Sequence, residues 1–237
     1  MTAIVIDKGR EQFLLMSKGR GFLALKSVIK TDVVVVMPTV PEDVDTIVLL
    51  EQQAWGDMAS TQDQMFSRLH IFSLGQLCAY INRQVVGYIS TIRIDTNDDL
   101  SDIPETYQVL TGSGLWISHI PDGNTLFCTR ITVDKKYQGL GIARKLIEKA
   151  RATVDSKKID VSKVLTYSRT FYGDYCEKVR ETWPEQYFRE TLDPVIAFHQ
   201  HLGAEVVKIL KDVVEGDKIS RGVFVVMKYP VVGGKGE

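Results

Sequence analysis

Near its centre the chain reads Ile131-Thr132-Val133-Asp134-Lys135-Lys136-Tyr137-Gln138-Gly139-Leu140-Gly141-Ile142-Ala143-Arg144-Lys145-Leu146. This pattern predicts a strand that runs into a glycine turn and then into an amphipathic helix. Glycines at positions 139 and 141 remove the Cβ atoms that would keep a ligand away from the backbone. Amides at a helix N-terminus point toward such a ligand, and the helix dipole favours negative charge there. The stretch therefore predicts a turn that binds a pyrophosphate group.

Other phosphate-binding turns have different requirements. A dinucleotide-binding fingerprint needs a third glycine at a fixed offset and an acid about 20 residues later. A P-loop needs Gly-Lys followed by Ser or Thr. Neither pattern occurs here. Arg144 and Lys145 place positive charge in the first turn of the helix, against its dipole, which makes sense if an anion lies between them. A plain glycine turn before a helix is the alternative.

Composition excludes several classes of function. The chain has 237 residues, a formal net charge of -1 and a pI near 6.4, so no general basic field attracts nucleic acid or a membrane surface. Cys78, Cys128 and Cys176 form no CxxC pair, which argues against a zinc site or disulfide framework and fits the cytoplasm. The four histidines show no metal-binding pattern, and no apolar run approaches the roughly 20 residues that span a bilayer. We expect no metal, nucleic acid or membrane partner.

The periodicity of the remaining chain predicts one α/β (α+β) domain over residues 32–230, preceded by an N-terminal extension (1–31) and followed by a disordered tail (231–237). The expected order is βααβββαβαββ, with a mixed central sheet and helices on both faces. The predicted strands are 33–37, 76–80, 84–94, 125–133, 161–167, 205–210 and 221–229. The predicted helices are one that starts at Thr39 or Pro41 and runs to Trp55-Gly56, and three more at 61–69, 142–154 and 194–202. Residues 95–124 are expected to be a long excursion and 168–192 an aromatic-rich insertion.

The glycine turn resembles the coenzyme A signature of the GNAT acyltransferase superfamily, in the form Gln138-x-x-Gly141-x-Ala143 after Val133-Asp134. The segments 34–43, 85–89 and 198–203 resemble further parts of that family, so the resemblance covers about 32–230. It implies the GNAT fold, in which strand 125–133 splays from strand 161–167 to admit the pantetheine arm. It also implies acetyl-CoA or another acyl-CoA, malonyl-CoA included, as cofactor. The implied binding residues are Ile131, Thr132, Val133, Gln138, Gly139, Leu140, Gly141, Ile142, Ala143 and Arg144.

The sequence departs from the family pattern at two places that concern chemistry. The strand 126–133 contains no carboxylate that would act as a base toward an amine. Where the family places a tyrosine in its last helix, this chain has Phe198-His199. Imidazole can replace a phenol as proton donor near neutral pH, so His199 is a catalytic candidate. The alternative is a helix residue that faces solvent.

A narrower resemblance concerns the segment 193–205 together with Val164-Leu165-Thr166. They resemble the GNAT-like domains that begin some polyketide assembly lines, and related domains that are fused to nitrilase-type hydrolases. The resemblance implies decarboxylation of malonyl- or methylmalonyl-CoA, with an acyl carrier protein as a further partner. It assigns functional roles to Thr166 and His199, and loosely to Trp55. A strand residue whose hydroxyl bonds to backbone is the alternative for Thr166.

Three functions therefore stay open. The first is acyl transfer from acyl-CoA to an amine or a carrier thiol, the second is decarboxylation, and the third is an inactive module that binds CoA or a partner. If Thr166 and His199 both face the thioester, decarboxylation is favoured; His199 alone favours transfer, and neither favours the module. Arg169 is a candidate partner for a substrate carboxylate or carrier phosphate, with a surface arginine as the alternative. The aromatic insertion forms either a wall of the acceptor site or a small separate core.

Overall fold

The computed structural model describes residues 5–7, 10–12, 33–155, 160–179, 187–188 and 193–231. The chain divides into two units, residues 1–33 and 34–237. In the first unit β1 (Val5–Asp7) pairs antiparallel with β2 (Arg10–Gln12). The predicted disordered tail lies outside the described residues from position 232 onward. The second unit contains the glycine turn and all the candidate site residues.

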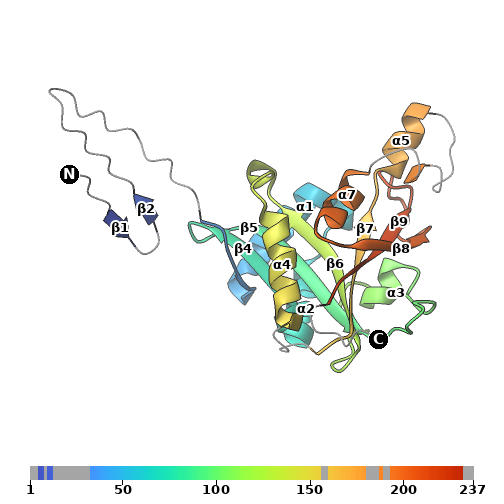
Figure 1. The fold of residues 1–237 in the computed structure, drawn as a ribbon, viewed down its shortest axis with the longest axis horizontal. Helices are drawn as coiled ribbons and strands as arrows, with labels where there is room; N and C mark the ends of the chain where they lie inside the picture. The colour runs from blue at the N-terminus through green and yellow to red at the C-terminus, as the bar shows by residue number, and fades with distance from the viewer. Residues whose placement is uncertain are drawn as a thin grey trace. The chain divides into compact units, whose positions relative to one another are not determined.

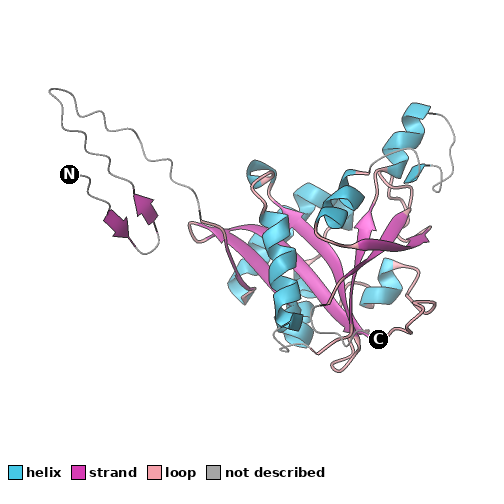
Figure 2. Cartoon of the chain, viewed as in Figure 1, coloured by secondary structure: helices cyan, strands magenta, loops and turns pink. Residues whose placement is uncertain are grey.

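A seven-stranded sheet forms the centre of the second unit, in the order β3-β4-β5-β6-β7-β9-β8 (Figures 1 and 2). All neighbouring strands are antiparallel except β6 and β7, which are parallel. The strands are β3 (Val35–Pro38), β4 (Gln76–Ile81), β5 (Gln84–Ile94), β6 (Thr125–Val133), β7 (Lys163–Arg169), β8 (Glu205–Leu210) and β9 (Phe224–Tyr229). The helices are α1 (Val44–Trp55), α2 (Gln62–Phe72), α3 (Tyr107–Thr111), α4 (Ile142–Asp155), α5 (Tyr172–Val179) and α7 (Pro194–His201). The predicted mixed α/β sheet is confirmed.

Two helices were not predicted from the sequence. The excursion contains the five-residue α3, which Thr106 caps by accepting a hydrogen bond from the Val109 amide. The insertion contains α5, which directly follows β7. A helix as short as α3 spans too few residues to show a 3.6-residue period, so pattern analysis cannot detect it. β7 also begins two residues later than predicted, and the Ser162 and Lys163 amides at its start both donate to the Asn124 carbonyl.

Opposite faces of the sheet are covered by different helices, as Figure 1 shows for α4 and α1. Side chains of α1 and α2 pack against Tyr88 of β5 in one cluster. On the other face α4 comes so close to Gly87 that a Cβ there would lie 3.0 Å from Cγ2 of Ile142. A larger residue at position 87 would push the start of α4 away from the sheet. Gly87 therefore fixes the height at which the glycine turn sits above β5 and β6.

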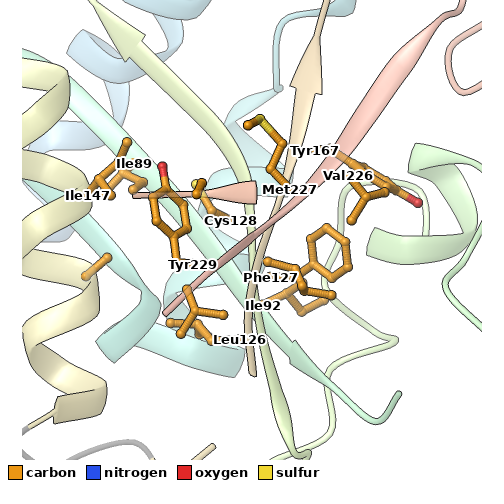
Figure 3. Close-up of a cluster of buried hydrophobic side chains, with 14 of the residues drawn as sticks. Ile89, Ile92, Leu126, Phe127, Cys128, Ile147, Tyr167, Val226, Met227 and Tyr229 are labelled. Carbon is orange, nitrogen blue, oxygen red and sulfur yellow. The ribbon is translucent and has the colours of Figure 1, made fainter. Parts of the chain in front are cut away.

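The main hydrophobic core lies on both sides of β5, β6, β7 and β9 (Figure 3). Leu126, Phe127, Met227 and Tyr229 are all buried within it. A fully buried side chain of this size contributes about 1.5–3 kcal/mol relative to leaving it exposed. The functional residues are thus attached to a sheet that is packed on both faces. None of the helices in the described part of the chain is long and apolar enough to cross a membrane.

A β-bulge in β6 reverses the side-chain alternation in the middle of the sheet. Ser90 pairs with Arg130, but the next residue, Thr91, pairs with Cys128, so Thr129 is the extra residue. In a regular strand residues two apart lie on the same face. Here Cys128 lies on the face that carries Tyr229, and Arg130 lies on the face of α1, where it contacts Glu51. Because of the bulge, Cys128 and Arg130 lie on opposite faces of the sheet although they are only two residues apart.

Candidate functional site

The glycine turn joins β6 to α4 through a short 3-10 helix at Lys135–Tyr137. The Asp134 amide donates to the Val86 carbonyl, and the Asp134 carboxylate accepts from the Lys136 amide at 2.8 Å, so the turn is anchored to β5. Gly139 and Gly141 have φ angles of 79° and 73°, in the left-handed region that glycine tolerates best. A Cβ built on either residue has no protein atom within 4 Å. The space over this backbone is therefore open to a ligand.

The start of α4 supplies the hydrogen-bond donors for such a ligand. The Lys145 amide donates to the Gly141 carbonyl at 3.0 Å. The amides before Lys145 belong to the first turn of the helix, where backbone N–H groups have no carbonyl partner within the helix. Lys135, Lys136 and Lys145 are exposed around the turn. Arg144 is exposed as well, and its Nε donates to Glu148 at 2.7 Å. Open backbone, N-terminal amides and surrounding lysines fit the pyrophosphate of coenzyme A.

Strands β6 and β7 separate beside this turn, as predicted. Their ladder covers Thr125 to Cys128 on β6 and Lys163 to Thr166 on β7, and it stops there although both strands continue. Beyond this point β6 stays paired with β5, and β7 stays paired with β9. The opening in the sheet is therefore held from both sides. An extended arm such as pantetheine fits into an opening of this kind because the strand edges there offer unpaired peptide groups.

The helix that carries His199 begins at a buried acid. Asp193 caps α7 by accepting from the Val195 and Ile196 amides. Its second oxygen accepts from the Phe171 amide at 2.8 Å and from the Tyr187 hydroxyl at 2.5 Å. His199, six residues later, is only 4% exposed and lies in the core. The alternative of a solvent-facing His199 is thus excluded, while its catalytic role stays a prediction.

Tyr229 of β9 orients the His199 ring. Its hydroxyl lies 2.5 Å from Nδ1 of His199. Burial lowers the pKa of His199 to about 4, so the imidazole is neutral at pH 7. Burial raises the pKa of the Tyr229 phenol, which therefore keeps its proton. When the phenol donates to Nδ1, the remaining ring proton is on Nε2. In that tautomer the Nε2 N–H of His199 is a neutral hydrogen-bond donor.

Thr166 lies on the same face of the sheet as Tyr229 and His199. It is the last β7 residue paired with β6, directly opposite Cys128, and it is 2% exposed. Burial raises the pKa of the Cys128 thiol to about 12, with a hydrogen bond to Thr166 opposing the shift. Cys128 in turn contributes to the shift of the Tyr229 pKa. The two predicted catalytic residues thus lie on one face of the sheet, Thr166 beside Cys128 and His199 beside Tyr229.

A cavity of about 400 Å³ lies on the opposite face of the sheet. Thr129 and Tyr167, which line it, are the first residues of β6 and β7 beyond their last pair. The cavity therefore begins where the two strands part. Trp55 also lines it, and its indole N–H donates to the Thr132 hydroxyl at 3.0 Å. Trp55 is therefore part of the cavity wall. That it contacts a substrate stays a prediction.

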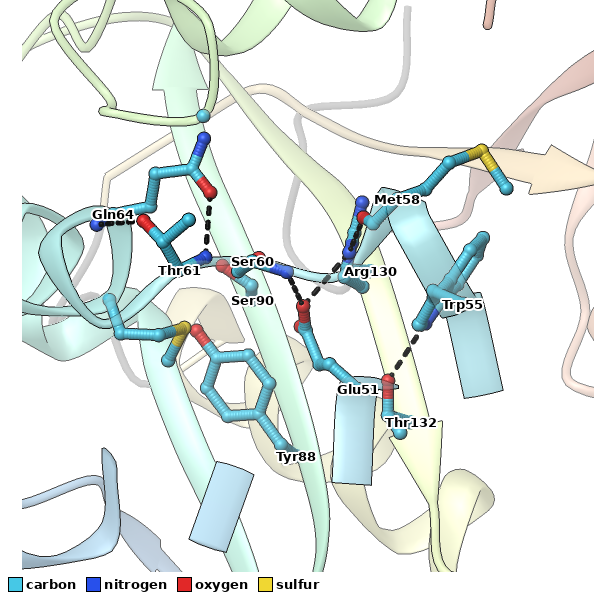
Figure 4. Close-up of polar contacts among 12 residues, drawn as sticks. Glu51, Trp55, Met58, Ser60, Thr61, Gln64, Tyr88, Ser90, Arg130 and Thr132 are labelled. Atoms are coloured by element: carbon cyan, nitrogen blue, oxygen red, sulfur yellow. Dashed lines mark hydrogen bonds and ion pairs between the residues drawn. The ribbon is translucent and has the colours of Figure 1, made fainter. Parts of the chain in front are cut away.

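Two charged residues of this cavity region were missed by sequence reasoning. Glu51 of α1 is completely buried, and its Oε2 accepts from Arg130 Nη1 at 2.9 Å and from the Ser60 amide at 2.8 Å (Figure 4). The Arg130 guanidinium lies 4.7 Å from the Trp55 ring centre and 5.1 Å from that of Tyr107. Glu51 and Arg130 are 79 positions apart in the chain. The only sequence signal was a glutamate on the otherwise apolar stripe of a helix.

The other predicted residues have structural partners. Arg169 pairs through both nitrogens with the buried Asp217 and lies over the Trp55 ring, so it is not a surface arginine. The aromatic residues Tyr172 and Tyr187 pack with Cys176 and Val223 in a small separate core and do not line the cavity. His201 is exposed and bonds to the Ala197 carbonyl. In the described part of the chain no group of three or more His, Cys, Asp or Glu side chains is arranged to hold a metal ion.

Comparison with known proteins agrees with this geometry. Residues 45–176 match the Acetyltransferase (GNAT) family, which is more than half of the chain. The chain therefore belongs to the GNAT acetyltransferase family, a class of acyl-CoA-dependent acyltransferases. Over 198 residues it is 25% identical to the uncharacterized N-acetyltransferase YkwB of Bacillus subtilis, covering 79% of this chain and 84% of that protein. It is 27% identical to the probable hydrolase YhcX of the same organism over 76% of this chain, but spans only 35% of that protein.

Two solved structures share the fold. The loading GNATL domain of CurA from Lyngbya majuscula superposes with a TM-score of 0.71 at 21% identity, covering 84% of this chain and 98% of that domain. The GNAT-like decarboxylase GphF, solved with isobutyryl-CoA, gives a TM-score of 0.72 at 18% identity, covering 83% and 98%. At these identities the likeness establishes the GNAT fold. It confirms the fold and the family relationship expected from the sequence.

Proposed function

We propose that this protein transfers an acyl group from acyl-CoA to an amine or a carrier thiol. The observation that carries the proposal is the pair of sites on opposite faces of one opening. The glycine turn suits the cofactor on the α4 face, and the 400 Å³ cavity reaches the opening from the α1 face. A transferase needs a second substrate beside the thioester, whereas a decarboxylase does not. A cavity at this position with charged and polar side chains in its wall supports an acceptor site.

In this reaction the amine attacks the thioester carbon, the C–S bond breaks, and the proton of the amine ends on the CoA sulfur. The residues of this chain bind and orient the reactants. The N–H of His199 and the hydroxyl of Thr166 are donors for the oxyanion of the tetrahedral intermediate. With an acyl carrier protein as acceptor, the same steps move the acyl group from one sulfur to another. The acyl group in either case is acetyl or a related small acyl chain.

A second function, decarboxylation of malonyl- or methylmalonyl-CoA, is supported by a different observation. Thr166 and His199 lie on one face, and His199 is neutral there. A neutral imidazole is a weak acid toward a thiolate but a good donor to an enolate oxygen. Loss of carbon dioxide leaves such an enolate, which then takes a proton from solvent to give acetyl- or propionyl-CoA. GphF, which shares the fold, is described as a GNAT-like decarboxylase in complex with isobutyryl-CoA.

Mass spectrometry of two incubations separates the proposals. The protein is mixed with acetyl-CoA and a pool of amines or a phosphopantetheinylated carrier protein, and separately with malonyl-CoA alone. Transfer produces free CoA and an acylated acceptor in the first mixture. Decarboxylation produces acetyl-CoA in the second mixture without any acceptor. CoA binding by calorimetry with neither product would support the third possibility, an inactive binding module.

A further inference from the structure

The buried charges on the α1 face do not balance. Arg68 and Arg130 both line the cavity and are 1% and 7% exposed. Glu51 is the buried carboxylate beside them, and it pairs with Arg130. Arg68 lies 4.1 Å over the Trp116 ring and donates from Nε to the Gly114 carbonyl, but no acidic side chain pairs with it among the described residues. A buried positive charge without a counter-ion is costly, so the cavity favours an anion.

Polar atoms along the wall lack partners as well. In the described part of the chain, the Arg130 Nε, the Tyr107 hydroxyl and the Ser60 hydroxyl are buried without a hydrogen bond. All three residues line the same cavity. Buried donors without a partner are rare in folded proteins, and several in one cavity indicate that a ligand supplies the missing acceptor. The second oxygen of Glu51 is also unpartnered, although Glu51 itself does not line the cavity.

The guanidinium of Arg130, which lines the cavity, is held by several neighbours. Arg130 is held by Glu51 and by the Met58 carbonyl at 2.8 Å (Figure 4), and the Trp55 and Tyr107 rings both lie close to its guanidinium. Burial opposes its charge, but Tyr107 and Glu51 raise the pKa of Arg130 above its ordinary value, so it stays charged. Asp57 and Glu215 also line the cavity, but both are exposed at its rim, where water screens them.

We propose that this cavity binds a substrate carboxylate, with Arg130, Tyr107 and Ser60 as its donors. A carboxylate matches a guanidinium in shape and can accept from all three groups. This inference rests on the proposed function, because it places the carboxylate next to the thioester. The carboxylate belongs either to the acceptor, as in an amino acid, or to the acyl chain, as in malonyl-CoA. The chemistry recognised is the same in both cases, and the experiment distinguishes the sources.

Binding is measured by calorimetry in two arms. In the first arm, protein saturated with CoA is titrated with the common amino acids, β-alanine and 4-aminobutyrate, each compared with its own carboxamide. In the second arm, malonyl-CoA is compared with acetyl-CoA. We expect at least one acid to bind about tenfold or more tightly than its amide, or malonyl-CoA to bind about tenfold more tightly than acetyl-CoA. The arm in which the preference occurs identifies the source of the carboxylate.

Variants of the cavity wall test the assignment of donors. Tyr107→Phe and Ser60→Ala remove hydroxyls that make no hydrogen bond in the described structure, so both should fold and should each reduce the preference several-fold. The double variant Glu51→Gln/Arg130→Gln removes both charges together and should abolish the preference. Tyr80→Phe is the matched control, because the Tyr80 hydroxyl bonds to Asp43 and does not line the cavity. It should leave the preference unchanged.

Different results would overturn this inference and the proposed function. Equal binding of acids and amides, together with equal binding of malonyl- and acetyl-CoA, would overturn the carboxylate site even if neutral amines are acylated. A preference that survives in Tyr107→Phe, Ser60→Ala and the double variant would also overturn it. Absence of CoA binding, in contrast, would remove the proposed function itself.

Discussion

The Tyr229 hydroxyl and Nδ1 of His199 lie 2.5 Å apart in the core, between the last strand and the last helix. Neither side chain is charged, so the pair differs from an acid–base pair in which one partner is ionised. Burial lowers the pKa of His199 to about 4 and raises that of Tyr229, so both are neutral at pH 7. This bond decides which ring nitrogen carries the proton, and therefore what His199 can offer a thioester.

Acid should destabilise the protein through His199. In the unfolded chain a histidine titrates near 6.5, whereas the folded pKa is about 4. Between these values the unfolded state binds the proton and the folded state does not, so stability falls as pH decreases from 6.5 to 4. The loss from this one group is on the order of 3 kcal/mol. Urea unfolding at several pH values measures it.

His199→Gln removes this contribution while the carboxylates continue to titrate. The difference between wild type and variant should therefore shrink as pH falls through this window. His201→Gln, on an exposed position of the same helix, is the matched control. An identical pH dependence in wild type and His199→Gln would contradict the assignment.

Tyr229→Phe should lower turnover about tenfold without weakening CoA binding more than about twofold. The substitution keeps the packing of the ring and removes only the donor to Nδ1, a loss of about 1 kcal/mol. Without that donor the imidazole populates both neutral tautomers, and less of it presents N–H at Nε2. Nitrogen NMR of labelled histidine reports the tautomer directly. A wild-type spectrum with the proton on Nδ1 would refute this role of Tyr229, because the bond would then point the other way.

His199→Ala tests the ring itself. We expect strongly reduced turnover and nearly normal CoA affinity, because none of the hydrogen bonds of His199 in the described structure involves the glycine turn. Steady-state kinetics and calorimetry measure the two quantities separately. An equal loss of both would show that His199 supports the fold of the site and takes no part in its chemistry.

The sequence revealed the parts of the site that depend on local geometry. Gly139 and Gly141 sit between a strand and a helix, and their positive φ angles follow from that short pattern. Asp193-Pro194 similarly marks the start of the helix that carries His199. Each of these features is encoded within a few residues, so pattern analysis could find them.

The acceptor-side chemistry could not be found this way. The extra residue at Thr129 moves Arg130 to the face opposite Cys128, whereas the regular alternation of a strand places both on one face. The residue types of β6 do not predict a bulge. The partner of Arg130 comes from a helix 79 positions earlier. Only the assembled sheet shows that an arginine and a glutamate share a buried site.

The glycine turn allows a prediction with a closely matched control. Gly141→Ala should weaken CoA binding tenfold or more, because the new Cβ would occupy the open space over the turn. Gly216→Ala is the control, because Gly216 has nearly the same φ, 74° against 73°, and equally open surroundings, but it lies in the loop between β8 and β9 and not in the glycine turn. Both should lose about 1 kcal/mol of stability from backbone strain. Calorimetric titration with CoA should separate them, and similar affinities for the two variants would contradict a ligand at the turn.

The Glu51–Arg130 pair should show strong coupling in stability. Arg130→Gln alone leaves the Glu51 carboxylate completely buried without its counter-ion, and Glu51→Gln alone leaves Arg130 in the same condition. Removing one partner of a buried pair costs about 3–5 kcal/mol, whereas removing both costs much less. The double variant should therefore be more stable than at least one of the single variants. Chemical unfolding of all four proteins measures the coupling energy. The exposed pair Arg144–Glu148 provides the reference value for weak coupling, about 0.5 kcal/mol. If the effects of the two substitutions at Glu51 and Arg130 were additive, the two side chains would not interact as a buried ion pair.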